Sequence, residues 1–65
     1  MLEIHTKNNQ HYLLNYRNIA YIEWSEGISA LFIYLTGINK PILLNSDDMS
    51  YEQLTSLYEQ IKENI

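Results

Sequence analysis

The sequence contains no cysteine, and it has only two glycines and one proline. The lack of cysteine excludes disulfide bonds and thiolate chemistry, and the two glycines form no phosphate-binding loop. No apolar run approaches the roughly 18 residues that a membrane-spanning helix needs. Glu3 and His5 also interrupt the apolar core that a signal peptide requires. We therefore expect a cytoplasmic chain with no membrane partner.

Basic residues are also few, because four Lys and Arg stand against eight acidic residues and give a formal net charge of −4. The four are scattered along the chain, at Lys7, Arg17, Lys40 and Lys62. Proteins hold duplex nucleic acid mainly by neutralising its phosphates with such residues, so we expect no duplex nucleic acid partner. A small ligand, or a basic surface on a protein partner, remains open.

The length of 65 residues predicts a single small domain over 1–65. The composition is 46% hydrophobic, which is too apolar for a disordered chain. Domains of this size bury only about 60% of the surface of the unfolded chain and are marginally stable. Because the chain has no disulfide, association with itself is the common remaining source of stability, and we expect a homodimer or higher oligomer.

The first third of the chain predicts three strands joined by polar turns. Apolar and polar residues alternate over 2–7 and again over 11–15, on either side of the polar turn 8–10, which predicts a hairpin. A third strand is predicted at 19–24, after a corner at 15–18. Period-two alternation places Ala20, Ile22 and Trp24 on one face of it and Ile19, Tyr21 and Glu23 on the other.

The segment Ile28–Thr36 is apolar on both faces. As a strand, it places Ala30, Phe32 and Tyr34 on one side and Leu31, Ile33 and Leu35 on the other. Gly27 is expected to supply a positive φ in the turn before it. One helix can cover only one of the two faces. We expect the aliphatic set in the core of the chain, and Phe32 and Tyr34 on the side that faces a partner.

A fifth strand is predicted at 41–45 and a C-terminal helix at about 50–64. Ser50 and Gln53 have the spacing of a capping box, and Met49 and Leu54 that of a hydrophobic staple. The helix carries one apolar stripe, made of Leu54, Leu57, Tyr58, Ile61 and Ile65. The predicted fold class is α+β: an antiparallel meander of about five short strands over about 2–45, followed by one amphipathic helix.

No pattern of residues predicts catalysis. His5 and His11 flank the first turn, and Glu3 shares a strand face with His5. Such a set can bind a metal ion. Two exposed histidines at a sheet edge are the preferred interpretation, because no third ligand has a distinctive spacing. Glu23 and Glu26 lie at a strand end and in a turn, where solvation is expected, whereas catalytic carboxylates need burial or a charged partner. We predict a protein that is not an enzyme and has no metal or cofactor.

Aromatic side chains gather in the predicted sheet, near the only arginine of the chain. The candidate binding residues are Tyr16, Arg17, Tyr21, Trp24, Phe32 and Tyr34. Tyr and Trp bury large areas while keeping one polar tip, which suits a protein interface, and their rings also stack on planar ligands such as nucleobases. Ordinary core packing in a sheet explains the same residues. These three interpretations stay open.

Four segments carry a family resemblance: Leu14-Asn15, Ile19–Glu23, Ile33–Gly37 and the helical segment Tyr51–Ile61. Together they resemble the small flagellar FlbD family and uncharacterised phage and prophage proteins of similar size. The loop at 45–49 differs from the shorter, more charged connection usual in FlbD-like chains. The resemblance implies a small bacterial or phage protein, a β-meander with a helix, that works by binding, and it assigns no site residue.

Two of these pieces are also similar to the LytTR DNA-binding domain, namely Ile22-Glu23 and Leu35–Gly37. This chain is shorter than that domain and lacks its basic character. DNA binding is therefore not implied.

Three functions follow as hypotheses. The first is a homo-oligomeric interaction protein, encoded by a phage or other mobile element, that inhibits or sequesters a host component. The second is a module that binds a small nucleotide-type ligand with Arg17 and the aromatic residues near it. The third is a flagellar or regulatory accessory protein.

Overall fold

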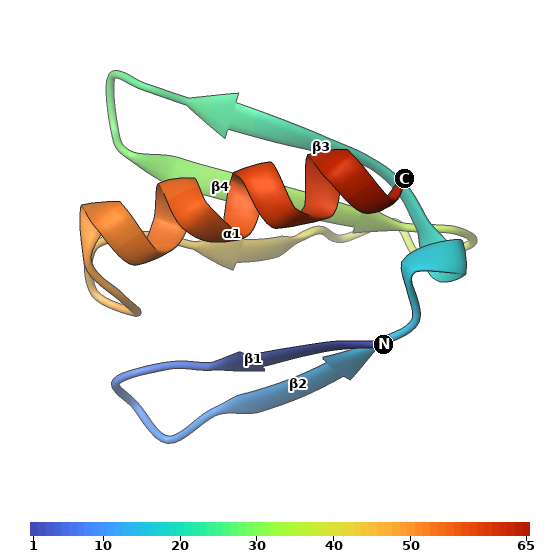
Figure 1. Cartoon of the computed structure of the whole chain (residues 1–65), viewed down its shortest axis with the longest axis horizontal. Helices are drawn as coiled ribbons and strands as arrows, with labels where there is room; N and C mark the ends of the chain where they lie inside the picture. Colours follow the sequence, from blue (N-terminus) through green and yellow to red (C-terminus); the bar gives the residue numbers. More distant parts are fainter.

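The computed structural model describes all 65 residues and contains two antiparallel sheets and one C-terminal helix (Figure 1). The first sheet is the hairpin β1 (Leu2–His5) and β2 (His11–Leu14), and the second has the order β3 (Ile19–Ser25), β4 (Ala30–Leu35), β5 (Ile42–Leu44). A short 3-10 helix, η1 (Tyr16–Asn18), joins the sheets, and the helix α1 spans Tyr51–Asn64. The predicted α+β meander with a C-terminal helix is confirmed. Its strands, however, divide into a hairpin and a three-stranded sheet.

The hairpin closes through a three-residue loop, 7–9. The Thr6 N–H donates to the Gln10 carbonyl at 3.0 Å, and the Asn9 N–H donates to the Thr6 carbonyl at 3.1 Å. Asn9 has a φ of 63°, the left-handed conformation that such loops place at their last residue. The Lys7 N–H also donates to the Asp48 carbonyl at 2.8 Å, which fixes the hairpin to the loop before α1.

A β-bulge near the start of β3 changes which residues face the core. The register with β4 shifts between Ile19 and Tyr21. As a result Ile19 is buried and Ala20 is exposed, so the faces predicted for these two residues were wrong. A bulge adds one residue to a strand and breaks its period of two, which alternation alone does not reveal.

The turn before β4 also differs from the prediction. Ser29, with a φ of 50°, occupies the left-handed region there, and Gly27 does not. The Ser29 N–H donates to the Glu26 carbonyl at 3.3 Å, and Ser25 pairs with Ala30 directly after this four-residue loop. Strand β4 therefore begins two residues later than predicted, and the side chain of Ile28 is exposed in the turn.

Helix α1 begins with the predicted capping box. The Gln53 N–H donates to Ser50 Oγ at 3.2 Å, and the Ser50 N–H donates to Gln53 Oε1 at 3.0 Å. These two hydrogen bonds satisfy two of the four backbone N–H groups that a helix leaves without partners at its start. At the other end Ile65 lies beyond the last helical residue and is exposed, so its predicted place on the buried stripe was wrong.

One hydrophobic core joins the hairpin, the three-stranded sheet and the helix. Its buried residues are Leu2, Ile4, Ile19, Leu31, Ile33, Leu44, Met49, Leu54, Leu57 and Ile61. Figure 1 shows α1 running across one face of the three-stranded sheet, with the hairpin lying beside both. Leu31 and Ile33 are fully buried, which confirms that the aliphatic side of β4 faces the core. The 14-residue helix is not long and apolar enough to cross a membrane.

Candidate binding surface on the outer face of the sheet

The face of the three-stranded sheet that points away from α1 carries two rows of aligned side chains. Tyr21 of β3 pairs with Tyr34 of β4, and Glu23 of β3 pairs with Phe32, which in turn pairs with Leu43 of β5. Residues that are directly opposite in register share a face, and successive residues alternate between faces. Because Leu31 and Ile33 face the core, these five side chains form the opposite surface, which we call the outer face.

Apolar area on the outer face remains accessible. Tyr21 is 52% exposed and Leu43 is 48% exposed, while Phe32 and Tyr34 between them are half-buried. The rings of Tyr21 and Tyr34 stack with centroids 4.3 Å apart and planes inclined by 11°. Aromatic pairs in such contact add stability beyond the area they bury. The two stacked rings therefore form a flat aromatic surface across β3 and β4.

Glu23 gives the outer face its one charge. Hydrogen bonding by the Glu23 carboxylate, followed by desolvation and by the negative charge of Glu23, raises the pKa of Tyr34 to about 12. Tyr34 is therefore a neutral phenol at physiological pH. The outer face thus combines apolar rings, phenol donors and a carboxylate acceptor.

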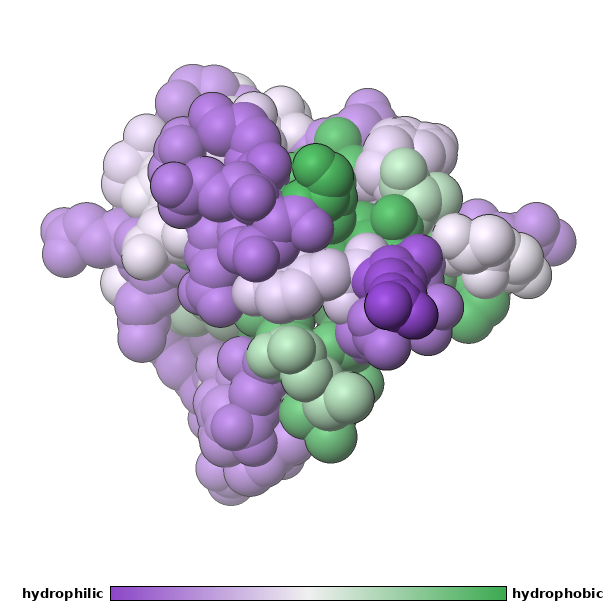
Figure 2. All heavy atoms as spheres, turned by 45° about the vertical axis from the view of Figure 1, so that its right-hand side comes forward, coloured by the Kyte–Doolittle hydropathy of each residue, from purple (hydrophilic) through white to green (hydrophobic).

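Exposed apolar side chains are not confined to the outer face. Met1, Leu13, Ile28, Ile38 and Ile65 are each more than half exposed. Figure 2 shows apolar residues reaching the surface between hydrophilic ones on the side of the molecule that it presents. The outer face differs from these positions because several of its aromatic and apolar side chains are direct neighbours in the register of one sheet.

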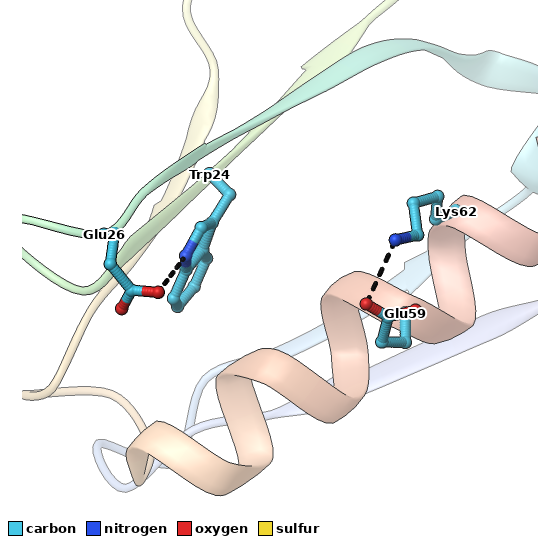
Figure 3. A network of polar contacts seen from close by, with 4 residues as sticks. All are labelled: Trp24, Glu26, Glu59 and Lys62. Carbon is cyan, nitrogen blue, oxygen red and sulfur yellow. Dashed lines mark hydrogen bonds and ion pairs between the residues drawn. The ribbon is translucent and has the colours of Figure 1, made fainter.

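Trp24, a candidate binding residue, instead packs against α1. It pairs in register with Leu31 on the core side of the sheet. Its ring lies 5.8 Å from that of Tyr58, nearly parallel, and 6.0 Å from that of Tyr51 in an edge-on arrangement. The Trp24 Nε1–H donates to Glu26 Oε1 at 3.4 Å (Figure 3). Trp24 therefore holds the helix to β3.

Glu26 receives a second hydrogen bond from the start of the helix. The Tyr51 hydroxyl donates to Glu26 Oε2 at 3.0 Å, and this hydrogen bond, followed by the charge of Glu26, raises the pKa of Tyr51. Farther along α1, Lys62 Nζ lies 3.1 Å from Glu59 Oε1 and 4.9 Å from the centre of the Tyr58 ring (Figure 3). The contacts of Glu26 join the turn after β3 to α1, whereas those of Lys62 lie within α1.

The remaining two candidate residues lie in η1. The Tyr16 hydroxyl accepts a hydrogen bond from Gln60 Nε2 at 2.9 Å, so Tyr16 also contacts the helix. Arg17 is exposed and forms no ion pair or contact with an aromatic ring. The structure thus brings Tyr21, Phe32 and Tyr34 together on the outer face, places Tyr16 and Trp24 against α1, and leaves Arg17 apart from both groups. The surface has no pocket.

Sequence reasoning missed Leu43 as part of the outer face and considered Glu23 only as a catalytic acid. The signal for Leu43 was available, because all three residues of β5 are apolar and a strand with one buried face needs only alternate ones. No such signal existed for Glu23, since its place beside Tyr34 depends on the register between strands.

Comparison of the chain with models of known protein families, with characterised proteins and with solved structures finds no match. The surface is therefore interpreted from its own geometry and chemistry.

Proposed function

We propose that this chain is a non-enzymatic binding protein that associates with itself through the outer face of its three-stranded sheet. The observation that carries the proposal is the position of Tyr21 and Leu43, which stay exposed on either side of the half-buried Phe32 although the chain has its own helix and core. A 65-residue domain without disulfides gains stability by covering such a surface.

A second copy of the chain suits this surface because the outer face carries both hydrogen-bond donors and an acceptor. Tyr21 and Tyr34 offer hydroxyl donors and flat rings, and Glu23 offers an acceptor. In a two-fold contact each copy would present the same patch to the other, so these groups can pair across the interface. Aromatic residues around a small number of polar groups are typical of the centre of protein interfaces.

Light scattering after size-exclusion chromatography tests this proposal. The wild-type chain is expected to have the mass of a dimer at micromolar concentrations. Leu43→Glu and Tyr21→Glu each place a second charge on the outer face, which already carries Glu23, and are expected to give monomers that keep the wild-type circular dichroism. Leu13→Glu, a change of the same type at an exposed position on the hairpin, is the matched control and should stay dimeric. A monomeric wild-type chain at these concentrations contradicts the proposal.

In the cell, we infer that the assembled protein sequesters or inhibits a host component in the cytoplasm, as expected of a small protein from a phage or other mobile element. The acidic composition supports a basic partner surface, since the chain carries a net charge of −4. Capture by the tagged wild-type chain from a lysate of its natural host tests this role. A partner retained by wild type at low salt and released at high salt is expected, whereas an unchanged capture at high salt would argue against charge as the basis.

A nucleotide-type ligand is the second candidate, and the stacked rings of Tyr21 and Tyr34 favour it. Such rings present a flat surface on which a base can stack. Thermal-shift measurements against a panel of nucleotides distinguish the two candidates. Stabilisation that is lost in Tyr34→Ser would support ligand binding, and no shift across the panel would exclude it.

A further inference from the structure

Strand β2 forms an open edge of the hairpin sheet. It pairs with β1 alone, without a bulge, and Figure 1 shows it at the border of the molecule. The Thr6 N–H donates to the Gln10 carbonyl at 3.0 Å, so these two residues form a hydrogen-bonded pair. In an antiparallel sheet such pairs alternate with pairs whose backbone groups point away from the partner strand. His11 and Leu13 of β2 belong to pairs of the second kind.

The backbone groups of His11 and Leu13 have no backbone partner within the chain. Each residue directs its N–H and its carbonyl away from β1, and no turn or loop of the chain hydrogen-bonds to these groups. The hairpin that carries them is held in place, because the Lys7 N–H donates to the Asp48 carbonyl. Donors and acceptors that alternate along a fixed edge suit the addition of one extended strand.

The edge of β2 lacks the features that block the other open strands. β3 carries a bulge, and β5 has only three residues and follows Pro41. Charged side chains, proline and bulges are the usual means by which proteins protect such an edge from pairing. β2 has the sequence His-Tyr-Leu-Leu and contains none of them. Its backbone is therefore free to pair with another strand.

The side chains beside this edge favour a segment of alternating character. Tyr12 and Leu14 pack against the core but stay half-buried, so apolar residues of an added strand can cover them. On the opposite face Leu13 is 66% exposed and pairs with Glu3, whose side chain is 64% exposed. The net charge of −4 attracts basic residues to this face. Apolar residues on the core side and basic residues on the other side therefore define the segment.

We propose that β2 is a docking edge for an extended, basic segment of a partner protein, which adds to the hairpin as its third strand. This inference rests on the proposed role as a binding protein, and it places the partner on the hairpin, away from the outer face. The occupant is a foreign segment because a second two-fold contact between copies, added to the one at the outer face, would link them into an open array. A third strand also strengthens a two-stranded sheet, which is the weakest kind.

Hydrogen exchange of the backbone amides, followed by NMR, tests the edge with a synthetic peptide of four Val-Lys repeats. In the free chain the amides of His11 and Leu13 should exchange fast, and those of Tyr12 and Leu14 slowly. The peptide is expected to slow exchange at His11 and Leu13 by roughly tenfold or more. The same peptide with every amide N-methylated has no N–H to offer and should slow neither. A Val-Glu peptide should bind more weakly than the Val-Lys peptide.

Two substitutions at one position separate the backbone from the side chain. Leu13→Pro removes one outward N–H without removing a hydrogen bond of the hairpin, and proline is accepted at such an edge. It should weaken peptide binding by roughly tenfold and keep the wild-type circular dichroism. Leu13→Ala keeps the N–H and is the matched control, which should still bind the peptide.

Three results would overturn the proposal: no slowing of exchange at millimolar peptide, equal slowing by the N-methylated peptide, or equal binding by Leu13→Pro. A change in the mass of the wild-type assembly caused by Leu13→Pro would also overturn it, since a second copy would then occupy the edge. A monomeric wild-type chain contradicts self-association through the outer face and leaves the peptide test unaffected, so the two proposals can fail separately.

Discussion

The ring of Tyr34 on β4 stacks on the ring of Tyr21 on β3, with 4.3 Å between centroids, and Glu23 lies on the same face. The stack ties two strands together on the side of the sheet that α1 does not cover. It also places a phenol where a negative charge is disfavoured, because Glu23 raises the pKa of Tyr34 from 10.0 to about 12.

This relationship predicts a loss of stability in alkaline solution. The pKa of Tyr34 is higher in the folded chain than in the unfolded chain, so between about pH 10 and 12 the folded state holds a proton that the unfolded state has lost. The contribution of Tyr34 is therefore complete below pH 10 and is lost as the pH rises through about 12. Urea unfolding across this range should show the decline.

The phenolate absorbance identifies the group responsible. A difference titration between wild type and Tyr34→Phe isolates the high pKa among the six tyrosines of the chain. Glu23→Gln removes the charge of the acceptor and is expected to move that pKa back towards 10.0. A difference titration that is the same with and without the Glu23 carboxylate would mean that this carboxylate does not set the pKa.

The aliphatic side of β4 makes a prediction about folding. Ile33 is fully buried and pairs with Ile22 and Ile42. Ile33→Asp places an unpaired charge in the core and is expected to unfold the chain, since small domains have only about 5–15 kcal/mol of stability. Ile33→Val removes one methylene group and should cost about 1 kcal/mol. Circular dichroism melting measures both.

A surface change on α1 is the control for Ile33. Glu59→Ala removes an exposed ion pair with Lys62 and should leave the melting temperature unchanged. If Ile33→Asp melted as wild type does, the inward position of Ile33 would be incorrect.

The turn between β3 and β4 offers a stabilising substitution. Ser29 has a φ of 50°, and the left-handed region costs an L-residue roughly 1–2 kcal/mol. Glycine avoids this cost but is more flexible in the unfolded chain, so Ser29→Gly should gain about 0.5 kcal/mol. Gly27→Ala is the matched comparison, because Gly27 has open space around it and needs no positive φ. It should not destabilise the chain, and a loss there larger than the gain at Ser29 would contradict this account of the turn.

The elements with local causes were predictable from the sequence. Ser50 and Gln53 are three residues apart, and the capping box depends only on that spacing and on the backbone between them. The hairpin was predictable for the same reason, since its polar turn and the alternation on both sides lie within 14 residues. The prediction that the aliphatic side of β4 faces the core was also correct, because it required only a comparison of the two faces of one strand.

The predictions that were wrong concern features that depend on contacts between residues far apart in the chain. The bulge at Ile19 serves the packing of β3 against β4 and the core, and no residue type marks it. Trp24 was grouped with the outer-face aromatics because its contacts with Tyr51 and Tyr58 come from a helix more than 25 residues later. The division into two sheets was not predictable either. The element that separates them, η1, is only three residues long and could equally have joined neighbouring strands of one sheet.

The bulge in β3 and Pro41 before β5 have a consequence for how far an assembly can grow. β3 and β5 are the outer strands of their sheet, and a regular outer strand is a template on which further chains add without end. The bulge distorts one of these borders, and Pro41, directly before β5, has no N–H with which to lengthen the other. Addition along the borders is thereby discouraged, while a two-fold contact through the outer face uses up the surface that forms it. The association proposed above would therefore close at a fixed number of chains and would not nucleate fibres.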